Sequence, residues 1–312
     1  MKEKCFFSGL IGCLHLKNKG TEMKYLILGV NGMAGHMIAQ YLIEQGNAVR
    51  GFAREKSSLS CETICGDARD KSSVLHALNA DEFDYVINAI GILNRAVDRN
   101  LSDGILLNSV LPHFLAENLW NRKAKLIHIS SDCVFEGTRG KYVETDIPDA
   151  LSYYGRSKAL GEVTDTRNLS IRTSIVGPEL KENGTGLFHW FMSQEDTVEG
   201  YERVIWSGVT TLQLAKAVAA DAHFPRTGLY HLVNNHFISK HDLLMLFNQH
   251  CRKKPIQIQS NTEISSDKTL LDTGGKGSLE IPDYETMVME MAEWISAHPQ
   301  LYRQYAVLGG VI

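Results

Sequence analysis

The sequence predicts an α/β protein whose core is a doubly wound parallel sheet, joined to a smaller C-terminal lobe. Over the first 176 residues, short apolar runs typical of strands alternate with stretches of helical period. Runs such as 85–87 and 126–127 are continuously apolar, which is typical of parallel strands buried on both faces. A chain of 312 residues with 44% hydrophobic content can bury a large core and exceeds the usual size of one domain.

The elements follow from these runs and from the turn residues between them. We expect strands at 24–30, 48–53, 62–65, 84–90, 124–130 and 169–176, and helices at 33–45, 70–79, 102–121 and 151–166. Beyond residue 177 the pattern is looser. Ser239 resembles the cap of a helix over 243–250, and Thr210 or Thr211 can cap another that ends at Ala222. Segment 228–233 reads as a strand that can return to the main sheet.

A glycine-rich turn follows the first strand. Gly29, Gly32 and Gly35 come directly after the apolar run 25–28 and open the first helix. Glycines at such a turn allow it to be tight, let the backbone approach a pyrophosphate, and let helix and strand pack closely. The spacing is G-x-x-G-x-x-G rather than the usual G-x-G-x-x-G, and a purely structural turn is the alternative. The position favours a Rossmann-type dinucleotide site.

A second group of residues has the chemistry of carbonyl reduction. Ser130 and Ser131 end the fifth predicted strand, and Tyr154 and Lys158 stand one helical turn apart on a following helix. A phenol has a pKa of about 10, and an adjacent ammonium lowers it. Tyr154 can then protonate a carbonyl oxygen while a serine hydroxyl holds that oxygen.

These motifs together resemble the extended short-chain dehydrogenase/reductases and, among them, the dTDP-4-dehydrorhamnose reductases. Further matching segments are 66–67, 88–89, 130–135, 154–162 and 171–176, and the resemblance runs from about residue 23 to about 294. It implies a catalytic triad of Ser131, Tyr154 and Lys158, an NAD(P)-binding domain over 23–176 and a substrate-binding lobe mainly over 177–312. The implied cofactor-binding residues are Gly29, Asn31, Gly32, Met33, Gly35, Arg54, Asp67, Ala68, Asn88, Ala89, Ile90, Asn108, Tyr154 and Lys158.

The end of the second strand bears on the choice of cofactor. An acid there would bind the ribose 2′-hydroxyl of NAD, whereas a cation accommodates the 2′-phosphate of NADP. Arg54 stands at this place, so we expect NADPH to be preferred and NADH to be the weaker alternative. A solvated charged turn is the other interpretation, because Glu55 follows directly.

The residues after the catalytic hydroxyl bear on the reaction. Sugar dehydratases of this superfamily have an Asp-Glu pair there, whereas this chain has Asp132 and Cys133. Elimination therefore lacks a base, and simple reduction remains. The resemblance implies a nucleotide-linked 4-keto-6-deoxy sugar as substrate, either dTDP-4-dehydrorhamnose or a UDP-linked N-acetylhexosamine, in the synthesis of cell-surface polysaccharide precursors. A non-catalytic subunit like the beta subunit of methionine adenosyltransferase and an NAD-dependent epimerase remain alternatives.

Arg172 is expected to pair internally, and a diphosphate clamp is its alternative role.

Composition bears on partners and location. The net charge of −4 offers no basic field for nucleic acid, and no apolar run is long enough to span a membrane. We expect a cytoplasmic protein, with a homodimer as a candidate state. The six cysteines lack paired spacing and the twelve histidines lack metal-ligand spacing, so we expect reduced, mostly buried thiols and no metal. Residues 1–22 precede the expected fold as an extension, and a signal segment is their alternative reading.

Overall fold

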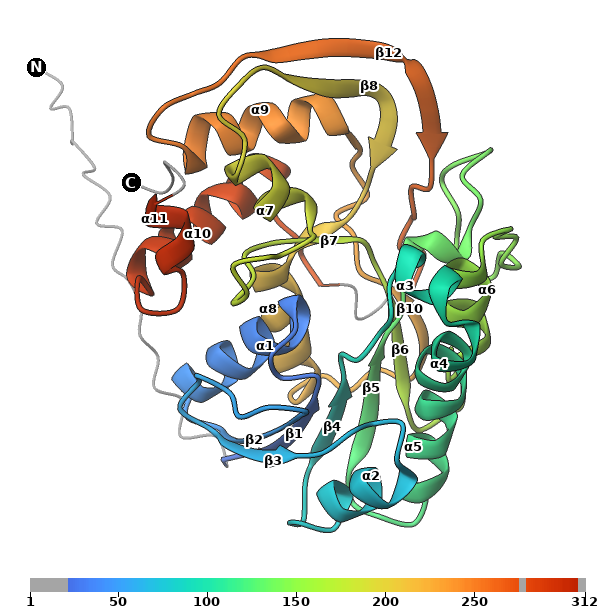
Figure 1. Ribbon diagram of the computed structural model, residues 1–312. Helices are drawn as coiled ribbons and strands as arrows, with labels where there is room; N and C mark the ends of the chain where they lie inside the picture. Colours follow the sequence, from blue (N-terminus) through green and yellow to red (C-terminus); the bar gives the residue numbers. More distant parts are fainter. Residues whose placement is uncertain (1–21, 275–278, 308–312) are drawn as a thin grey trace, which may run out of the picture.

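A seven-stranded parallel sheet forms the centre of the protein. The computed structural model describes residues 22–274 and 279–307. The strand order is β10-β6-β5-β4-β1-β2-β3, and every neighbouring pair is parallel. The strands are β1 Lys24–Leu28, β2 Ala48–Ala53, β3 Glu62–Cys65, β4 Tyr85–Asn88, β5 Lys125–Ile129, β6 Leu169–Arg172 and β10 Gly228–His231. Helices cover both faces (Figure 1), so the predicted doubly wound fold is confirmed.

The helices divide between the two faces of this sheet. In Figure 1, α1 and α8 lie on one side, and α2, α5 and α6 lie on the other. The bounds are α1 Met33–Glu44, α2 Lys71–Leu78, α3 Asn94–Arg99, α4 Leu101–Ile105, a π-helix Leu106–Val110, α5 Leu111–Leu119, α6 Tyr153–Leu160 and α8 Thr211–Asp221. This division gives the sheet two buried faces, as its continuously apolar strands require.

Alternation along each strand explains why both faces are buried. On β1, Tyr25 and Ile27 belong to the core under α1 and α8, whereas Leu26 and Leu28 belong to the core under α2 and α5. All four side chains are at most 1% exposed. Full burial of each such side chain contributes roughly 1.5–3 kcal/mol of transfer free energy.

A smaller lobe is assembled from the C-terminal segments. Its sheet has the order β11-β8-β12, from β8 Val198–Trp206, β11 Ile238–Ser239 and β12 Ile258–Asp267. Its helices are α7 Leu187–Met192, α9 Lys240–Cys251, α10 Tyr284–Ala297 and α11 Arg303–Val307. A short parallel pair of β7 Ile175–Val176 with β9 Val209–Thr210 lies between this lobe and the main sheet (Figure 1). Segment 228–231, as β10, pairs with β6 in the main sheet.

Three of the expected elements differ in extent. The helix expected over 102–121 is interrupted by the π-helix, and the strand expected over 169–176 ends at Arg172 because β7 pairs with β9 instead. The helix expected over 151–166 is shorter and ends at Leu160; at the following Gly161 a Cβ would lie 1.9 Å from the Asn108 carbonyl oxygen. The expected caps are confirmed: Ser239 and Thr210 accept hydrogen bonds from the Asp242 and Gln213 amides at 2.9 and 3.2 Å.

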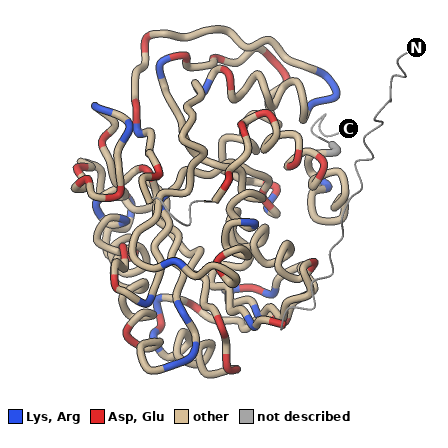
Figure 2. Tube along the Cα trace, turned by 180° about the vertical axis from the view of Figure 1, so that it is seen from behind, with Lys and Arg blue, Asp and Glu red and all other residues tan. Residues whose placement is uncertain are grey.

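Charge and cysteine placement complete the description. Figure 2 shows Lys and Arg interspersed with Asp and Glu along the described chain. No helix in the described ranges is long and apolar enough to cross a membrane, and no three His, Cys, Asp or Glu side chains there could together hold a metal ion.

The expectation of mostly buried thiols is wrong, because among the four described cysteines Cys65 is exposed and only Cys251 is fully buried. The extension predicted at 1–22 lies outside the described residues except for Glu22.

Candidate active site

The turn after β1 is packed too tightly for side chains. Gly29 has a φ of +82°, and a Cβ there would lie 3.0 Å from Ile90 Cγ1 and 3.2 Å from the Ala89 carbonyl carbon. A Cβ on Gly35 would lie 2.2 Å from the Gly29 carbonyl oxygen, so α1 packs directly on the turn. Gly32 caps α1 without a side chain. The first backbone amides of this helix have no partner within the helix. They therefore face a space in which an anion can lie close to the backbone.

A cavity of about 350 Å³ opens over this turn, at the carboxyl ends of β1, β2 and β4. Chain order reverses between β1 and β4, and such switch points are where open parallel sheets bind ligands. The cavity is lined by Gly29, Asn31, Gly32, Phe52, Ala53, Arg54, Glu55, Gly66, Asp67, Ala68, Arg69, Ala89, Ile90, Gly91, Ile92, Asp103, Leu107 and Lys181. Its glycine floor, apolar walls and charged rim suit a dinucleotide.

One buried polar atom at this cavity lacks a protein partner. The Asn31 side-chain amide donates to the Glu55 carbonyl at 3.0 Å, which leaves its Oδ1 buried without a hydrogen bond among the described residues. A buried acceptor without a donor costs about 1–3 kcal/mol. A ligand hydroxyl in the cavity would satisfy it.

The serine turn and helix α6 meet closely. Ser131 follows β5 and caps the 3-10 turn Asp132–Val134, where its Oγ accepts the Cys133 amide at 3.0 Å and donates to Asp132 Oδ1 at 3.1 Å. A Cβ on Gly155 would lie 2.1 Å from the Cys133 carbonyl oxygen, so α6 rests against this turn through a glycine. Tyr154 is thereby held beside Ser131, and both side chains are buried.

Burial sets the pKa values of the two α6 residues. Burial raises the pKa of Tyr154 well above its ordinary value, and a hydrogen bond with Ser131 opposes that rise. Burial lowers the pKa of Lys158 to about 8, with Glu162 opposing. Lys158 Nζ donates to the Ile129 carbonyl at 2.7 Å. The expectation that Lys158 lowers the pKa of Tyr154 is therefore wrong for this arrangement, because desolvation of the phenol is the largest cause and acts in the opposite direction.

A buried ion pair lies behind the serine turn. Glu162, which ends the motif that begins at Tyr154, receives two hydrogen bonds of 2.7 Å from Arg172, and the two side chains are 5% and 3% exposed. The Ser130 hydroxyl donates to the same carboxylate at 2.7 Å. Arg172 therefore pairs internally, as expected from sequence.

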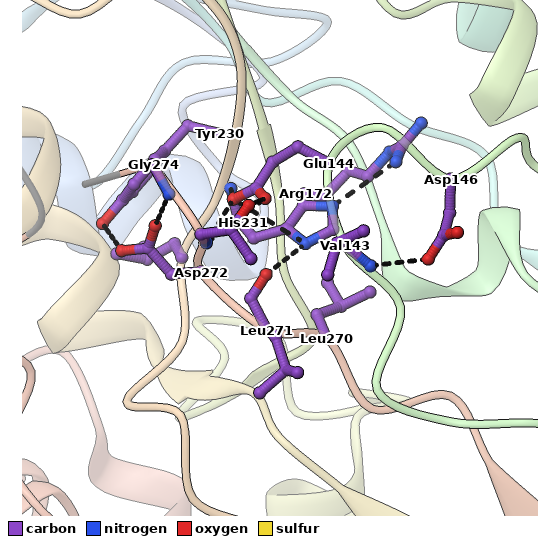
Figure 3. Close-up of polar contacts among 12 residues, drawn as sticks. Val143, Glu144, Asp146, Arg172, Tyr230, His231, Leu270, Leu271, Asp272 and Gly274 are labelled. Atoms are coloured by element: carbon purple, nitrogen blue, oxygen red, sulfur yellow. Dashed lines mark hydrogen bonds and ion pairs between the residues drawn. The ribbon is translucent and has the colours of Figure 1, made fainter.

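The polar network continues from Arg172 to His231 and Glu144 (Figure 3). Arg172 lies 3.4 Å from His231 Nε2, and His231 Nδ1 donates to the Leu271 carbonyl at 2.9 Å. Because Nδ1 has the proton in this contact, a neutral His231 can accept at Nε2. Glu144 accepts the His231 amide at 3.3 Å and the Thr273 hydroxyl at 2.6 Å. These contacts link the loops near 144 and 271 to the serine turn.

A protein-family model matches most of this chain. The model described as RmlD substrate binding domain matches residues 23–305. The chain belongs to this family. The match extends past residue 294, where the resemblance in the sequence ends, and includes most of α11.

Individual relatives of this RmlD-family chain divide into two kinds. It is 34% identical over 143 residues to the probable low-salt glycan biosynthesis reductase Agl14 of Haloferax volcanii, which covers 45% of this chain and 48% of that protein. It is 56% identical over 157 residues to the methionine adenosyltransferase 2 subunit beta of Rattus norvegicus, which covers 48% of this chain and 46% of that protein. Each match thus spans about half the length of the relative.

A solved structure shows the same fold. The dTDP-4-dehydrorhamnose reductase of Bacillus anthracis, in complex with NADP, superposes with a TM-score of 0.73 at 17% identity over 86% of this chain and 98% of that one. At this identity the likeness concerns the fold alone.

The cavity brings together many of the predicted cofactor residues of this family member. Gly29, Asn31, Gly32, Arg54, Asp67, Ala68, Ala89 and Ile90 line it, whereas Met33, Gly35, Asn88, Asn108, Tyr154 and Lys158 do not. The two asparagines among the latter bond to nearby backbone. Asn88 Oδ1 accepts the Ile90 amide at 3.2 Å, and the Asn108 side chain bonds both backbone groups of Ile92 at 2.9 and 3.0 Å. Their roles toward a cofactor stay predictions.

Sequence reasoning missed three charged residues of the rim. Arg69 makes several hydrogen bonds to Asp67, and these bonds lower the pKa of Asp67. Arg69 also donates one hydrogen bond of 3.1 Å to Asp103. Arg69 lies two residues after Asp67, so its position was readable from the sequence. Asp103 and Lys181 reach the cavity only through tertiary structure, and no local signal marks them.

Proposed function

We propose that the protein is a nicotinamide-dependent sugar-nucleotide reductase that converts the C4 ketone of a nucleotide-linked 4-keto-6-deoxy sugar into an alcohol. The observation that supports it most is the close approach of Gly155 to the Cys133 carbonyl, which holds Tyr154 within hydrogen-bond reach of Ser131. A phenol and a serine hydroxyl in this arrangement can act as a proton donor and an oxygen holder.

The cavity fits the cofactor that this reaction needs. The glycines at 29 and 35 leave room that a Cβ would fill, and the unpaired Asn31 Oδ1 suits a ribose hydroxyl. Gly29, Gly32 and Asn31 would hold the dinucleotide backbone, with Arg54 at the adenosine ribose. The bound nicotinamide would supply hydride to the ketone carbon.

The protein's own residues would manage the oxygen and its proton. Ser131 would hold the ketone oxygen by a hydrogen bond, and Tyr154 would protonate it as it becomes an alkoxide. The raised pKa of Tyr154 keeps the phenol protonated at neutral pH and thus ready to donate. Lys158, buried behind it, would hold the nicotinamide ribose.

Cys133 supports reduction over elimination. Burial raises the pKa of its thiol to about 12, so the side chain stays neutral at pH 7 and cannot act as a base. The substrate is therefore reduced without loss of water. The two candidate sugars are dTDP-4-dehydrorhamnose and a UDP-linked 4-keto-6-deoxy-N-acetylhexosamine, precursors of cell-surface polysaccharide.

The test is to incubate the purified full chain with the product of a sugar-nucleotide 4,6-dehydratase and to follow NADPH absorbance. We expect one NADPH to be consumed per sugar, with either the dTDP-linked or the UDP-linked ketone. No oxidation with either sugar would overturn the proposal.

The relation to the beta subunit of methionine adenosyltransferase defines a second candidate, a regulatory subunit without catalysis. A pull-down with a methionine adenosyltransferase catalytic subunit distinguishes the two. Tight complex formation together with inactivity toward ketosugars would favour this second function.

Arg54 provides a prediction about the cofactor. Its guanidinium can form a fork of charged hydrogen bonds with a 2′-phosphate, which NADH lacks. Arg54→Ala is expected to weaken NADPH binding by roughly tenfold to a hundredfold and NADH binding by less than about threefold. Isothermal titration of both cofactors measures this. Lys56→Ala is the control, because Lys56 is also exposed but does not line the cavity; equal affinities of the wild type for NADH and NADPH would refute the preference.

A further inference from the structure

We propose that Lys181 is a further cofactor-binding residue, which contacts the pyrophosphate from a loop of the C-terminal half. The inference rests on the proposed use of a nicotinamide dinucleotide. Among the residues that line the cavity, Lys181 alone lies outside the segment 29–107. It thus belongs to the part of the chain that follows the main run of strands, and it reaches the cavity from a separate segment.

The loop that presents Lys181 is closed on itself. It connects β7 to α7, and the Glu179 carboxylate accepts the Thr185 and Gly186 amides at 2.8 and 2.7 Å. These two bonds join the start of the loop to its end, with Lys181 between them. A loop fixed in this way loses less entropy when its side chain binds a ligand than a free loop does.

Helix α11 forms hydrogen bonds with the same loop. The Glu179 amide donates to the Tyr305 hydroxyl at 2.9 Å, and the Gln304 side chain donates to the Glu179 carbonyl. Tyr305 is fully buried, so this support belongs to the packed core. The position of Lys181 is therefore set by the folded lobe and not by local sequence.

The far end of the loop rests on the start of α1. A Cβ on Gly186 would lie 3.1 Å from Met33 Sδ, and Met33 is the first residue of that helix. The N-terminus of a helix after a glycine turn is where a dinucleotide pyrophosphate binds. This proximity indicates the pyrophosphate, not the 2′-phosphate, as the group that Lys181 meets.

The charges of the rim leave Lys181 available. Arg69 is bound to both Asp67 and Asp103, whereas Lys181 makes no ion pair within the described ranges. An exposed, unpaired ammonium at the mouth of a cavity can bind a diphosphate without first breaking another contact.

The experiment uses ligands that separate the two phosphate sites. ADP-ribose has the pyrophosphate without a 2′-phosphate, and 2′-AMP has the 2′-phosphate without a pyrophosphate. Titrated into the full chain, Lys181→Ala is expected to weaken ADP-ribose, NADH and NADPH alike by roughly threefold to tenfold and to leave 2′-AMP unchanged. Arg54→Ala should instead weaken NADPH and 2′-AMP and leave ADP-ribose and NADH nearly unchanged. Glu182→Ala, at the exposed neighbouring residue outside the cavity lining, is the matched control.

The outcomes separate this inference from the proposed function. Normal binding of all four ligands by Lys181→Ala would overturn the inference alone, and so would a loss confined to NADPH and 2′-AMP. A wild-type protein that binds neither NADH nor NADPH would overturn the proposed function and the inference together. Partial recovery of ADP-ribose affinity in Lys181→Arg would support the charge as the cause.

Discussion

Replacing Tyr154 with Phe is expected to reduce kcat by about a hundredfold to ten-thousandfold, the usual contribution of a general acid. The change removes one hydroxyl from a buried ring next to Ser131 and leaves the packing of α6 on the serine turn in place. The alkoxide would then have to take its proton from water. Cofactor affinity should stay within about twofold, because the phenol does not line the dinucleotide cavity.

The neighbouring tyrosine provides the control. Tyr153 is 52% exposed and lies one residue earlier on the same helix, so Tyr153→Phe should leave kcat nearly unchanged. Both variants are compared by NADPH consumption with the ketosugar and by cofactor titration. Near-normal turnover of Tyr154→Phe would refute the assignment of Tyr154 as proton donor.

The parts of the fold that the sequence predicted have strong local signals. The strands of the main sheet are continuous apolar runs, and the caps at Thr210 and Ser239 are hydroxyls placed before apolar helices. Strand β12 escaped prediction because its residues are mostly polar and exposed, and it forms through pairing with β8. Helix α10 was missed although Asp283 caps it by accepting the Thr286 amide at 2.8 Å, so that signal was readable.

The candidate site likewise has parts that a local motif predicts and parts that depend on tertiary structure. The glycine turn and the Tyr154–Lys158 pair are local motifs, and a single segment contains each of them. The network from Glu162 through Arg172 to His231 joins the segment after α6 to β6 and β10, and His231 lies beside Arg172 only because β10 returns to the sheet next to β6. Sequence spacing predicts which residues these strands contain, but their contacts depend on strand order.

Replacing Arg172 with Met is expected to destabilise the protein by about 3–5 kcal/mol, the usual cost when one member of a buried ion pair is removed. Glu162 would stay buried with its charge unpaired. The Ser130 hydroxyl, which donates to Glu162, would lose its fixed position at the start of the serine turn. Urea unfolding, read as a change in midpoint at constant slope, measures the loss.

Two further variants test whether burial of the pair is the cause. Lys216 and Glu290 form a partly exposed pair of 2.8 Å between α8 and α10, and Lys216→Met should cost less than about 1 kcal/mol. Replacing both Arg172 and Glu162 by apolar residues should recover part of the stability lost in Arg172→Met, because no unpaired charge remains inside. If Arg172→Met costs no more than Lys216→Met, burial of the ion pair does not stabilise the protein. The position of Arg172 would then depend on its packing over the Phe135 ring, whose centroid lies 5.1 Å away.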